Sequence, residues 1–216
     1  MTEAEELESG ALALGVDLDA SQIESLVSFA ALLRRWNAAF NLVSRRDIPR
    51  LAARHLLDAL SLVPMLVGRR ALDLGTGAGL PGIPLAIARP DIEFTLLDRS
   101  ERRIRFVRQA TLDLGLKNVD PVSADYADFR PAALFDTVVS RAVAKPAALW
   151  REASTQLALN GIALFQVGAL ERDTDPLDTD VESVSVHIPG LTQLHRVLRV
   201  RRHAVTPNLV PQDSDR

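Results

Sequence analysis

The sequence predicts an α/β fold: a parallel β-sheet preceded by a helical N-terminal segment and followed by an antiparallel strand pair. Three observations support this. Before Arg70, apolar residues recur with the 3.6-residue period of an amphipathic helix. After Arg70, short apolar runs alternate with helix-like segments, which is typical of a parallel sheet covered by helices on both faces. After residue 180, two strand-like runs are joined by a five-residue turn, "PGLTQ".

The N-terminal segment is predicted to hold two main helices. The first spans 23–43, with Asp19 or Ser21 as its cap. The second runs from about Pro49 to Leu62 and is ended by Pro64. We expect residues 1–68 to form a helical cap and residues 69–216 the sheet-containing domain, the two making one compact unit.

The second part of the chain contains the predicted strands, each a short apolar run bounded by Gly, Pro, Asp or Ser. Helices are predicted at 100–114 and 145–159, and the polar segment 171–180 is predicted to be a loop. The strands of the parallel sheet are predicted at 71–74, 93–98, 119–124, 135–140 and 161–167, and those of the antiparallel pair at 181–188 and 194–201.

Composition excludes several classes of protein. The chain has no cysteine, which rules out disulfides, thiolate metal sites and cysteine nucleophiles. Its four histidines are not spaced as metal ligands, so we expect no metal. No apolar run approaches the ~20 residues of a membrane span, and the acidic N-terminus does not resemble a signal peptide. A cytoplasmic protein that does not enter membranes is expected.

The formal net charge of −3 conceals clusters of arginine, and only two of the 25 basic residues are lysines. Guanidinium groups bind phosphate in a bidentate manner, so the arginine clusters are compatible with an anionic partner. The clusters are Arg34/Arg35, Arg45–Arg54, Arg99–Arg108 and Arg196–Arg202.

The segment "LDLGTGAGLPG", residues 72–82, contains two overlapping glycine patterns. Gly77, Gly79 and Gly82 form the G-x-G-x-x-G of a dinucleotide site. Starting at Asp73, the same segment forms D-x-G-x-G-x-G, the spacing of a loop that binds S-adenosylmethionine. Asp98, at the end of the next predicted strand, is placed to accept hydrogen bonds from ribose hydroxyls of either ligand.

Three features favour S-adenosylmethionine over a dinucleotide. Asp73 would face a pyrophosphate unfavourably but can approach a methionine ammonium. Pro81 removes a backbone N–H from the region that would cradle phosphate. A dinucleotide fold also requires a second mononucleotide-binding half, whereas this chain ends in an antiparallel pair. The alternative is that the glycines only make a tight strand-to-helix turn.

Longer motifs carry a closer resemblance. "WNAAFNLVSRRD", "RHLLDAL", "LDLGTGAGLPGIPLAI", "TLLDRSERRIRFV" and "VVSRAVA" occur in this order, and nearly the whole chain from about Ala20 resembles the RsmG/GidB family of 16S rRNA guanine-N7 methyltransferases. The resemblance implies a class I methyltransferase (Rossmann-like) fold with an N-terminal helical cap. It also implies S-adenosylmethionine as cofactor and a guanine in the decoding region of small-subunit rRNA as target.

The resemblance also assigns residues to the cofactor. Gly75 and Leu80 would lie against it, Gly77 and Gly79 complete the turn, and Asp98 takes the ribose. Tyr126 and Ala127 stand where the family usually has a small residue and a glutamate, so backbone groups there, or the carboxylates of Asp125 or Asp128, would reach the adenine. The family often has "NLT" at 41–43 and a lysine at 167, where this chain has "NLV" and valine.

Arg141, in "SRA", matches the family's arginine beside the reacting end of the cofactor. Guanine N7 has a free lone pair, so its methylation needs positioning but no general base. Arg141 would contact guanine O6, a phosphate or the cofactor carboxylate; a surface salt bridge is the alternative.

The remaining candidates for RNA or substrate contact are polar side chains of the helical segment and a basic helix. Asn37 and Asn41 interrupt the apolar stripe one turn apart. His55 and Asp58 would face substrate, or form an ordinary i,i+3 pair. Arg102 and Arg103 belong to an arginine cluster without evident matching acids, which suggests rRNA phosphates rather than only a solvated face.

The function predicted from the sequence is transfer of a methyl group from S-adenosylmethionine to guanine N7 of 16S rRNA by a monomeric enzyme. Two alternatives stay open: a methyltransferase acting on a small molecule or a protein, and a cofactor-binding module without catalysis. The partner would be 16S rRNA or the small ribosomal subunit.

Overall fold

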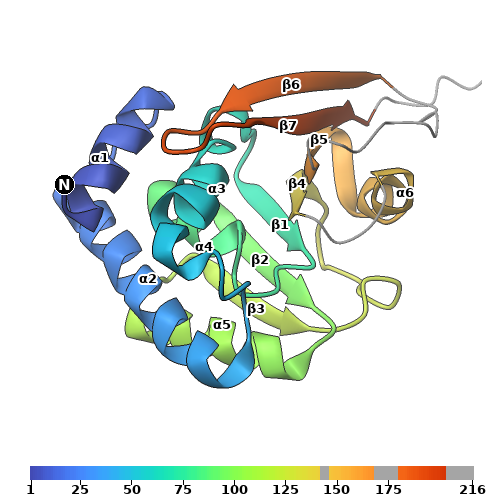
Figure 1. Ribbon diagram of the computed structural model, residues 1–216. Helices are drawn as coiled ribbons and strands as arrows, with labels where there is room; N and C mark the ends of the chain where they lie inside the picture. Colours follow the sequence, from blue (N-terminus) through green and yellow to red (C-terminus); the bar gives the residue numbers. More distant parts are fainter. Residues whose placement is uncertain (142–145, 168–179, 203–216) are drawn as a thin grey trace, which may run out of the picture.

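The computed structural model describes residues 1–141, 146–167 and 180–202, and its centre is a seven-stranded sheet (Figure 1). The strand order is β3-β2-β1-β4-β5-β7-β6. Neighbouring strands from β3 to β5 pair in parallel, whereas β7 is antiparallel to both β5 and β6. The strands are β1 Arg70–Leu74, β2 Glu93–Asp98, β3 Val119–Ser123, β4 Phe135–Arg141, β5 Leu157–Val167, β6 Val181–His187 and β7 Leu194–Arg201.

All seven predicted strands are therefore confirmed, with bounds within one residue of the prediction for every strand except β5. β5 begins at Leu157, four residues earlier than predicted, and α6 (Pro146–Gln156) ends correspondingly sooner. Leu157 is fully buried and pairs with Phe135 of β4, so burial in the sheet prevails over the helical pattern of the sequence. The start of the helix predicted from Lys145 and nearly all of the predicted loop 171–180 lie outside the described residues.

The N-terminus contains a helix that the sequence analysis did not identify, α1 (Glu3–Ala13). A capping box starts it: Thr2 Oγ1 accepts from the backbone N–H of Glu5, and the Glu5 carboxylate accepts from the N–H of Thr2. α2 (Ala20–Phe40) begins with the same device at Asp19 and Gln22, which confirms Asp19 as its cap.

The second predicted helix is less regular than expected. A 3₁₀ turn, η1 (Ile48–Arg50), leads into the π-helix η2 (Ala52–Leu57), the short α3 (Asp58–Leu60) and a second 3₁₀ turn, η3 (Val63–Met65). α3 ends at Leu60, two residues before the predicted Leu62, and Pro64 lies beyond it in the first turn of η3, where its missing N–H is not needed. Wide π turns often occur at functional sites.

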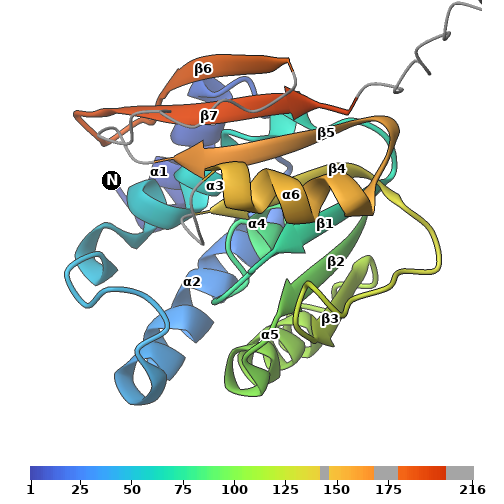
Figure 2. The ribbon, with the colours of Figure 1, turned by 90° about the vertical axis from the view of Figure 1, so that its right-hand side faces the viewer.

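Helices cover both faces of the sheet (Figure 2). α4 (Gly82–Ala88) and α5 (Glu101–Asp113) pack on one face, and α2 packs over both of them. α6 covers the opposite face against β4 and β5. One continuous cluster of buried apolar side chains includes Leu7 of α1, Leu33 of α2 and Leu96 of β2, so the N-terminal helices share the core of the sheet.

The topology creates a place for ligands at one edge of the sheet. β1 pairs with β2 on one side and with β4 on the other, so the chain crosses over in opposite directions from this point. The carboxyl ends of these strands diverge into loops there, which is where open α/β sheets bind ligands.

Candidate active site

Asp73, the penultimate residue of β1, organises the glycine loop from beneath. Its Oδ2 accepts hydrogen bonds from Thr76 Oγ1 at 2.6 Å and from the backbone N–H of Gly82 at 2.8 Å. The carboxyl group is fully buried, and this burial raises its pKa to about 6. Its Oδ1 is buried and has no hydrogen-bond partner among the described residues. Asp73 is not among the residues that line the pocket described below, and in this structure its carboxylate holds the loop.

The three glycines of the D-x-G-x-G-x-G pattern, Gly75, Gly77 and Gly79, all have a positive φ, which side chains with a Cβ adopt at a cost. Gly82 instead begins α4 and is needed for close packing. A Cβ on Gly82 would lie 2.7 Å from Asp73 Oδ2 and 2.8 Å from Leu96 Cγ. The glycines thus make the turn tight and bring α4 close to β2.

Asp98 ends β2 and supports the loop from the side. Its Oδ2 accepts from the backbone N–H of Gly77 at 2.9 Å, and its Oδ1 accepts from that of Ser100 at 2.8 Å. Arg103 Nη1 lies 3.4 Å from Oδ2. The carboxylate is largely buried but borders the pocket, so it is held in place with lone pairs left for a ligand.

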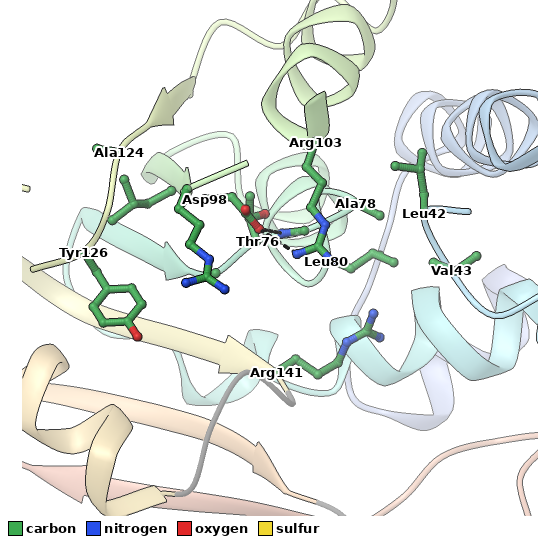
Figure 3. A pocket seen from close by; sticks show the side chains of 14 residues that line it. Leu42, Val43, Thr76, Ala78, Leu80, Asp98, Arg103, Ala124, Tyr126 and Arg141 are labelled. Carbon is green, nitrogen blue, oxygen red and sulfur yellow. Dashed lines mark hydrogen bonds and ion pairs between the residues drawn. The ribbon is translucent and has the colours of Figure 1, made fainter. Parts of the chain in front are cut away.

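A pocket of about 420 Å³ opens above this loop (Figure 3). Six of the residues predicted for the cofactor line it: Gly75, Gly77, Leu80, Asp98, Tyr126 and Arg141. The other lining residues are Leu42, Val43, Thr76, Ala78, Leu97, Arg99, Arg103 and Ala124.

Ala127 and Gly79 do not line the pocket. Ala127 is exposed, and its N–H donates to Asp125 Oδ1 at 3.0 Å, so this amide is already engaged. The pocket therefore does not support the assignment of Ala127 to the cofactor, and Ala124 and Tyr126 are the residues of the same loop that line it. Gly79 shapes the turn from outside the pocket.

Arg141 lies at the end of β4 and is shared by two pockets. Its Nη1 is 3.1 Å from His55 Nδ1 and 3.5 Å from Asp58 Oδ2. The side chain is only 19% exposed, so the predicted alternative of an ordinary surface salt bridge does not describe it.

The second pocket, of about 360 Å³, adjoins the first across Arg141. Segments far apart in the sequence meet in it: the end of β5, the start of β7 and the turns from 47 to 58. Its lining residues are Asp47, Arg54, His55, Asp58, Arg141, Gln166, Val167, Gln193, Leu194 and His195.

Asp58 is the centre of the polar wall of this second pocket. Its carboxylate is buried, and Oδ1 lies 2.8 Å from His195 Nδ1 and accepts from Gln166 Nε2 at 3.2 Å. Together with the Arg141 contact, these partners show that His55 and Asp58 are not the simple i,i+3 pair considered as an alternative. Each is bound to residues distant in the sequence.

Asn37 and Asn41 do not form a joint polar site. Asn37 is buried, and its Oδ1 accepts from the N–H of Val43 at 2.9 Å, which positions the segment that borders the first pocket. Asn41 is exposed in the left-handed conformation and ends α2, with its Oδ1 accepting from Arg45 Nε at 3.3 Å. Their contacts are structural.

The arginine cluster of α5 has more acidic partners than expected. Arg103 pairs with Asp98 at the pocket, and Arg108 pairs with Glu101 at 2.6 Å. The expectation of an arginine cluster without matching acids is therefore wrong for these two residues. Arg102 is exposed, as are Arg99 and Arg105, so the basic surface that remains is smaller and lies beside the pocket mouth.

Among the residues of the site that were not identified from the sequence, three make hydrogen bonds that hold the site in place. His195 and Gln166 contact Asp58 over sequence separations of 137 and 108 residues, and no local pattern distinguishes them from other strand residues. Thr76 follows Gly75 directly, and a hydroxyl three residues after Asp73 was a usable local signal. Among the described residues no cluster of three potential metal ligands occurs, and no helix is long and apolar enough to cross a membrane.

Comparison with known proteins identifies the family of this chain. The model of the family described as rRNA small subunit methyltransferase G (GidB) matches residues 22–204. The chain belongs to this family. It is 40% identical over 199 residues to the ribosomal RNA small subunit methyltransferase G of Nitrosococcus oceani, covering 90% of this chain and 93% of that one. It is 44% identical over 189 residues to the protein of the same name from Methylococcus capsulatus, covering 86% and 92%.

Solved structures agree on the fold. A methyltransferase from Aquifex aeolicus superposes with a TM-score of 0.55 at 16% identity, covering 80% of this chain and 97% of that one. A precorrin-6y C5,15-methyltransferase from Geobacter metallireducens gives 0.53 at 15% identity, covering 76% and 93%. The class I methyltransferase fold predicted from the sequence is thus confirmed, and this family member is a methyltransferase.

Proposed function

We propose that this protein transfers the methyl group of S-adenosylmethionine to N7 of a guanine in the decoding region of 16S rRNA. The observation that carries the proposal is the meeting of Asp98, the glycine loop and Arg141 around one pocket at the strand-order reversal, in a chain of the rRNA small subunit methyltransferase G family.

The residues of the first pocket fit the cofactor. Asp98 carries free lone pairs for the ribose hydroxyls, while Leu80 and Tyr126 offer apolar surface for a base. The backbone of Gly75 and Gly77 approaches the pocket without side chains. Beneath the loop, Asp73 Oδ1 is a buried acceptor to which no described residue donates, so a cationic group bound above the loop would gain from its charge. The bound cofactor supplies an electrophilic methyl group on a sulfonium.

The chain's own contribution to this reaction is positioning and electrostatics. Guanine N7 has no proton to remove, so no residue has to act as a base. Arg141 stands between the two pockets and is held by Asp58 and His55, which fixes the direction of its guanidinium group. A fixed donor at this boundary orients the acceptor base or the cofactor carboxylate at low entropic cost.

The exposed arginines beside the pocket mouth support an RNA partner. Arg99, Arg102 and Arg105 extend from the start of α5, next to the pocket that Arg99 and Arg103 line. Cationic side chains around a reaction site position a phosphate backbone without reading its sequence. The partner we propose is 16S rRNA within the small subunit, bound in the cytoplasm by a monomer of this chain.

The proposal is tested with small ribosomal subunits from cells that lack this protein. Purified enzyme and methyl-labelled S-adenosylmethionine are added, and aniline cleavage then locates N7-methylguanine. One cut in the decoding region is the expected result. Label at another atom or in a co-purified protein would favour a different methyl acceptor, and cofactor binding without any methylated product would favour a non-catalytic module.

A further inference from the structure

We propose that Arg103 is a binding residue with two alternative partners: the Asp98 carboxylate in the free protein, and a phosphate group of the RNA once the ribose of the cofactor occupies Asp98. This inference rests on the proposed function, because it assumes that Asp98 binds the ribose and that the substrate is an RNA. Its consequence is that the cofactor and the RNA each strengthen the binding of the other.

Arg103 lies where the ribose is expected. Its side chain reaches from α5 into the first pocket beside Asp98 (Figure 3), and both residues line that pocket. Arg103 Nη1 donates to Asp98 Oδ2 at 3.4 Å. The Asp98 side chain is only 4% exposed, so a ligand has to approach it through the pocket that Arg103 also occupies.

The hydrogen-bonding capacity of Asp98 makes the two partners compete. A carboxylate offers about four lone-pair positions. Oδ1 accepts from the backbone N–H of Ser100 at 2.8 Å, and Oδ2 accepts from that of Gly77 at 2.9 Å. Arg103 takes the second position on Oδ2. Two neighbouring ribose hydroxyls are two donors, so binding both of them requires the position that Arg103 holds.

Arg103 is the partner of Asp98 that a ligand can displace. Its distance of 3.4 Å is longer than the about 2.8 Å of a strong charge-assisted hydrogen bond. The Arg103 side chain is 51% exposed, so its guanidinium can turn into water, whereas the N–H groups of Gly77 and Ser100 are fixed by the backbone. An ion pair with such an exposed member is weak, so losing it lowers the apparent affinity for the cofactor by only a small factor.

The surroundings of the displaced side chain favour an anion. Arg99 lines the same pocket, Arg102 is the preceding residue of α5, and both are exposed. Glu101, the acidic residue in the first turn of α5, is engaged by Arg108 at 2.6 Å. A guanidinium released from Asp98 therefore joins other cationic groups at the pocket mouth, where a phosphate is the complementary partner.

This exchange couples the binding of the two ligands. Without the cofactor, an RNA phosphate has to break the pair of Arg103 and Asp98, whereas with the ribose in place the pair is already broken. Each ligand therefore raises the affinity for the other by the same factor. Exposed ion pairs correspond to about two- to fivefold in an equilibrium constant, which sets the size of the expected coupling.

The first experiment measures the binding of adenosine and 2′,3′-dideoxyadenosine, two uncharged nucleosides, by titration calorimetry. Arg103→Ala should bind adenosine about two- to fivefold more tightly than the natural protein, because the ribose no longer displaces a partner of Asp98. Dideoxyadenosine has no hydroxyls for Asp98 and should bind both proteins equally.

Arg108→Ala is the matched control. It removes an arginine and an ion pair from the same helix, but Arg108 is not among the residues that line the first pocket. Its affinity for adenosine should equal that of the natural protein.

The second experiment measures binding to small ribosomal subunits from cells that lack this protein, with and without S-adenosylhomocysteine. This compound carries the ribose but no transferable methyl group, so no methylation occurs during the measurement. It should raise the affinity for the subunit about two- to fivefold in the natural protein and in Arg108→Ala, and should leave that of Arg103→Ala unchanged.

Three results would overturn the inference while leaving the proposed function intact: no gain in adenosine binding by Arg103→Ala, an equal gain for the two nucleosides, or a subunit affinity of the natural protein that S-adenosylhomocysteine does not change. The last of these needs no variant. If the natural protein bound neither S-adenosylhomocysteine nor the small subunit, the proposed function would fail, and the inference would fail with it.

Discussion

At the scale of single residues, the site depends on buried charges that the protein itself satisfies. Asp98 is held by two backbone N–H groups and Arg103 before any ligand arrives. Four side-chain atoms surround the carboxyl group and carbonyl of Asp58: Ser61 Oγ, Gln166 Nε2, His195 Nδ1 and Arg141 Nη1. Such groups are preorganised, because the free energy of orienting them is supplied by folding rather than by binding.

Replacing Asp98 by alanine is expected to weaken S-adenosylmethionine binding by roughly 10–100-fold, since charged hydrogen bonds to the ribose and support for Gly77 are lost together. Titration calorimetry measures this directly. Asp91→Ala is the control, because Asp91 is exposed, pairs with Arg89 and is not among the residues that line the first pocket. Equal affinities of the two variants would mean that the ribose lies elsewhere.

The titrations of His55 and Asp73 change the free energy of unfolding in opposite directions as pH falls. The pKa of His55 is lowered to about 4 in the folded protein, so the unfolded chain binds a proton first and stability is lost as pH falls from about 6.5 to 4. The pKa of Asp73 is raised to about 6, so its contribution increases as pH falls from about 6 to 4. The two effects partly cancel in the natural protein.

Replacing His55 by glutamine removes one of these two titrations and leaves that of Asp73. We expect the stability of the variant relative to the natural protein to rise by about 3 kcal/mol between pH 7 and pH 4, because only the destabilising titration is removed. Urea unfolding at both pH values, monitored by circular dichroism, gives the difference. A constant difference between the two proteins would contradict the buried neutral state of His55.

At the scale of elements, helix ends and loops place the site. α2 starts at a capping box and ends at Asn41, after which the chain turns so that Leu42 and Val43 border the first pocket. The π-helix η2 then brings His55 into the second pocket. A change at a helix start should therefore affect stability, while a change at the other end should affect ligand binding.

The cap of α2 provides a test at this scale. Asp19→Ala removes the acceptor for the N–H of Gln22 and should cost about 1 kcal/mol of unfolding free energy, with little change in cofactor affinity. Denaturant unfolding checks the first part and calorimetry the second. Asp17→Ala, an exposed position two residues before the cap, should leave both values unchanged.

At the scale of the whole molecule, the first pocket is assembled from the segment after α2, β1, β2, β4 and the loop after β3, so a bound cofactor links the N-terminal helices to the sheet. Binding to the folded state alone raises stability by mass action. The nature of the ligand can therefore be read from thermal unfolding of the complete chain.

S-adenosylmethionine at about 100 times its Kd should stabilise the protein by about 2.7 kcal/mol, which corresponds to a rise in Tm of roughly 5–10 °C for a chain of this size. NAD at the same concentration should give no shift, because the antiparallel β7 replaces a second mononucleotide-binding half. A shift with NAD and none with S-adenosylmethionine would reverse our assignment of the glycine loop.

The sequence by itself determined the strands, the glycine turn and the positions of Asp98 and Arg141 at strand ends. These features depend on local chemistry: period-2 and period-3.6 patterns, glycine at positive φ, and an acid at a fixed distance from the turn. α1 was missed although its Thr2–Glu5 capping box is visible in the sequence, and the irregular helix at 48–65 was predicted as a regular one.

Tertiary structure decided the rest of the site. Only the fold brings His195 and Gln166 to Asp58, joins His55 to Arg141, buries Asp73 beneath the loop and excludes Ala127 from the pocket. These contacts depend on which strands are neighbours and on which side chains lose water, and neither property is encoded in a short window of sequence. Local patterns therefore predicted the cofactor loop, while the second pocket required the packed sheet.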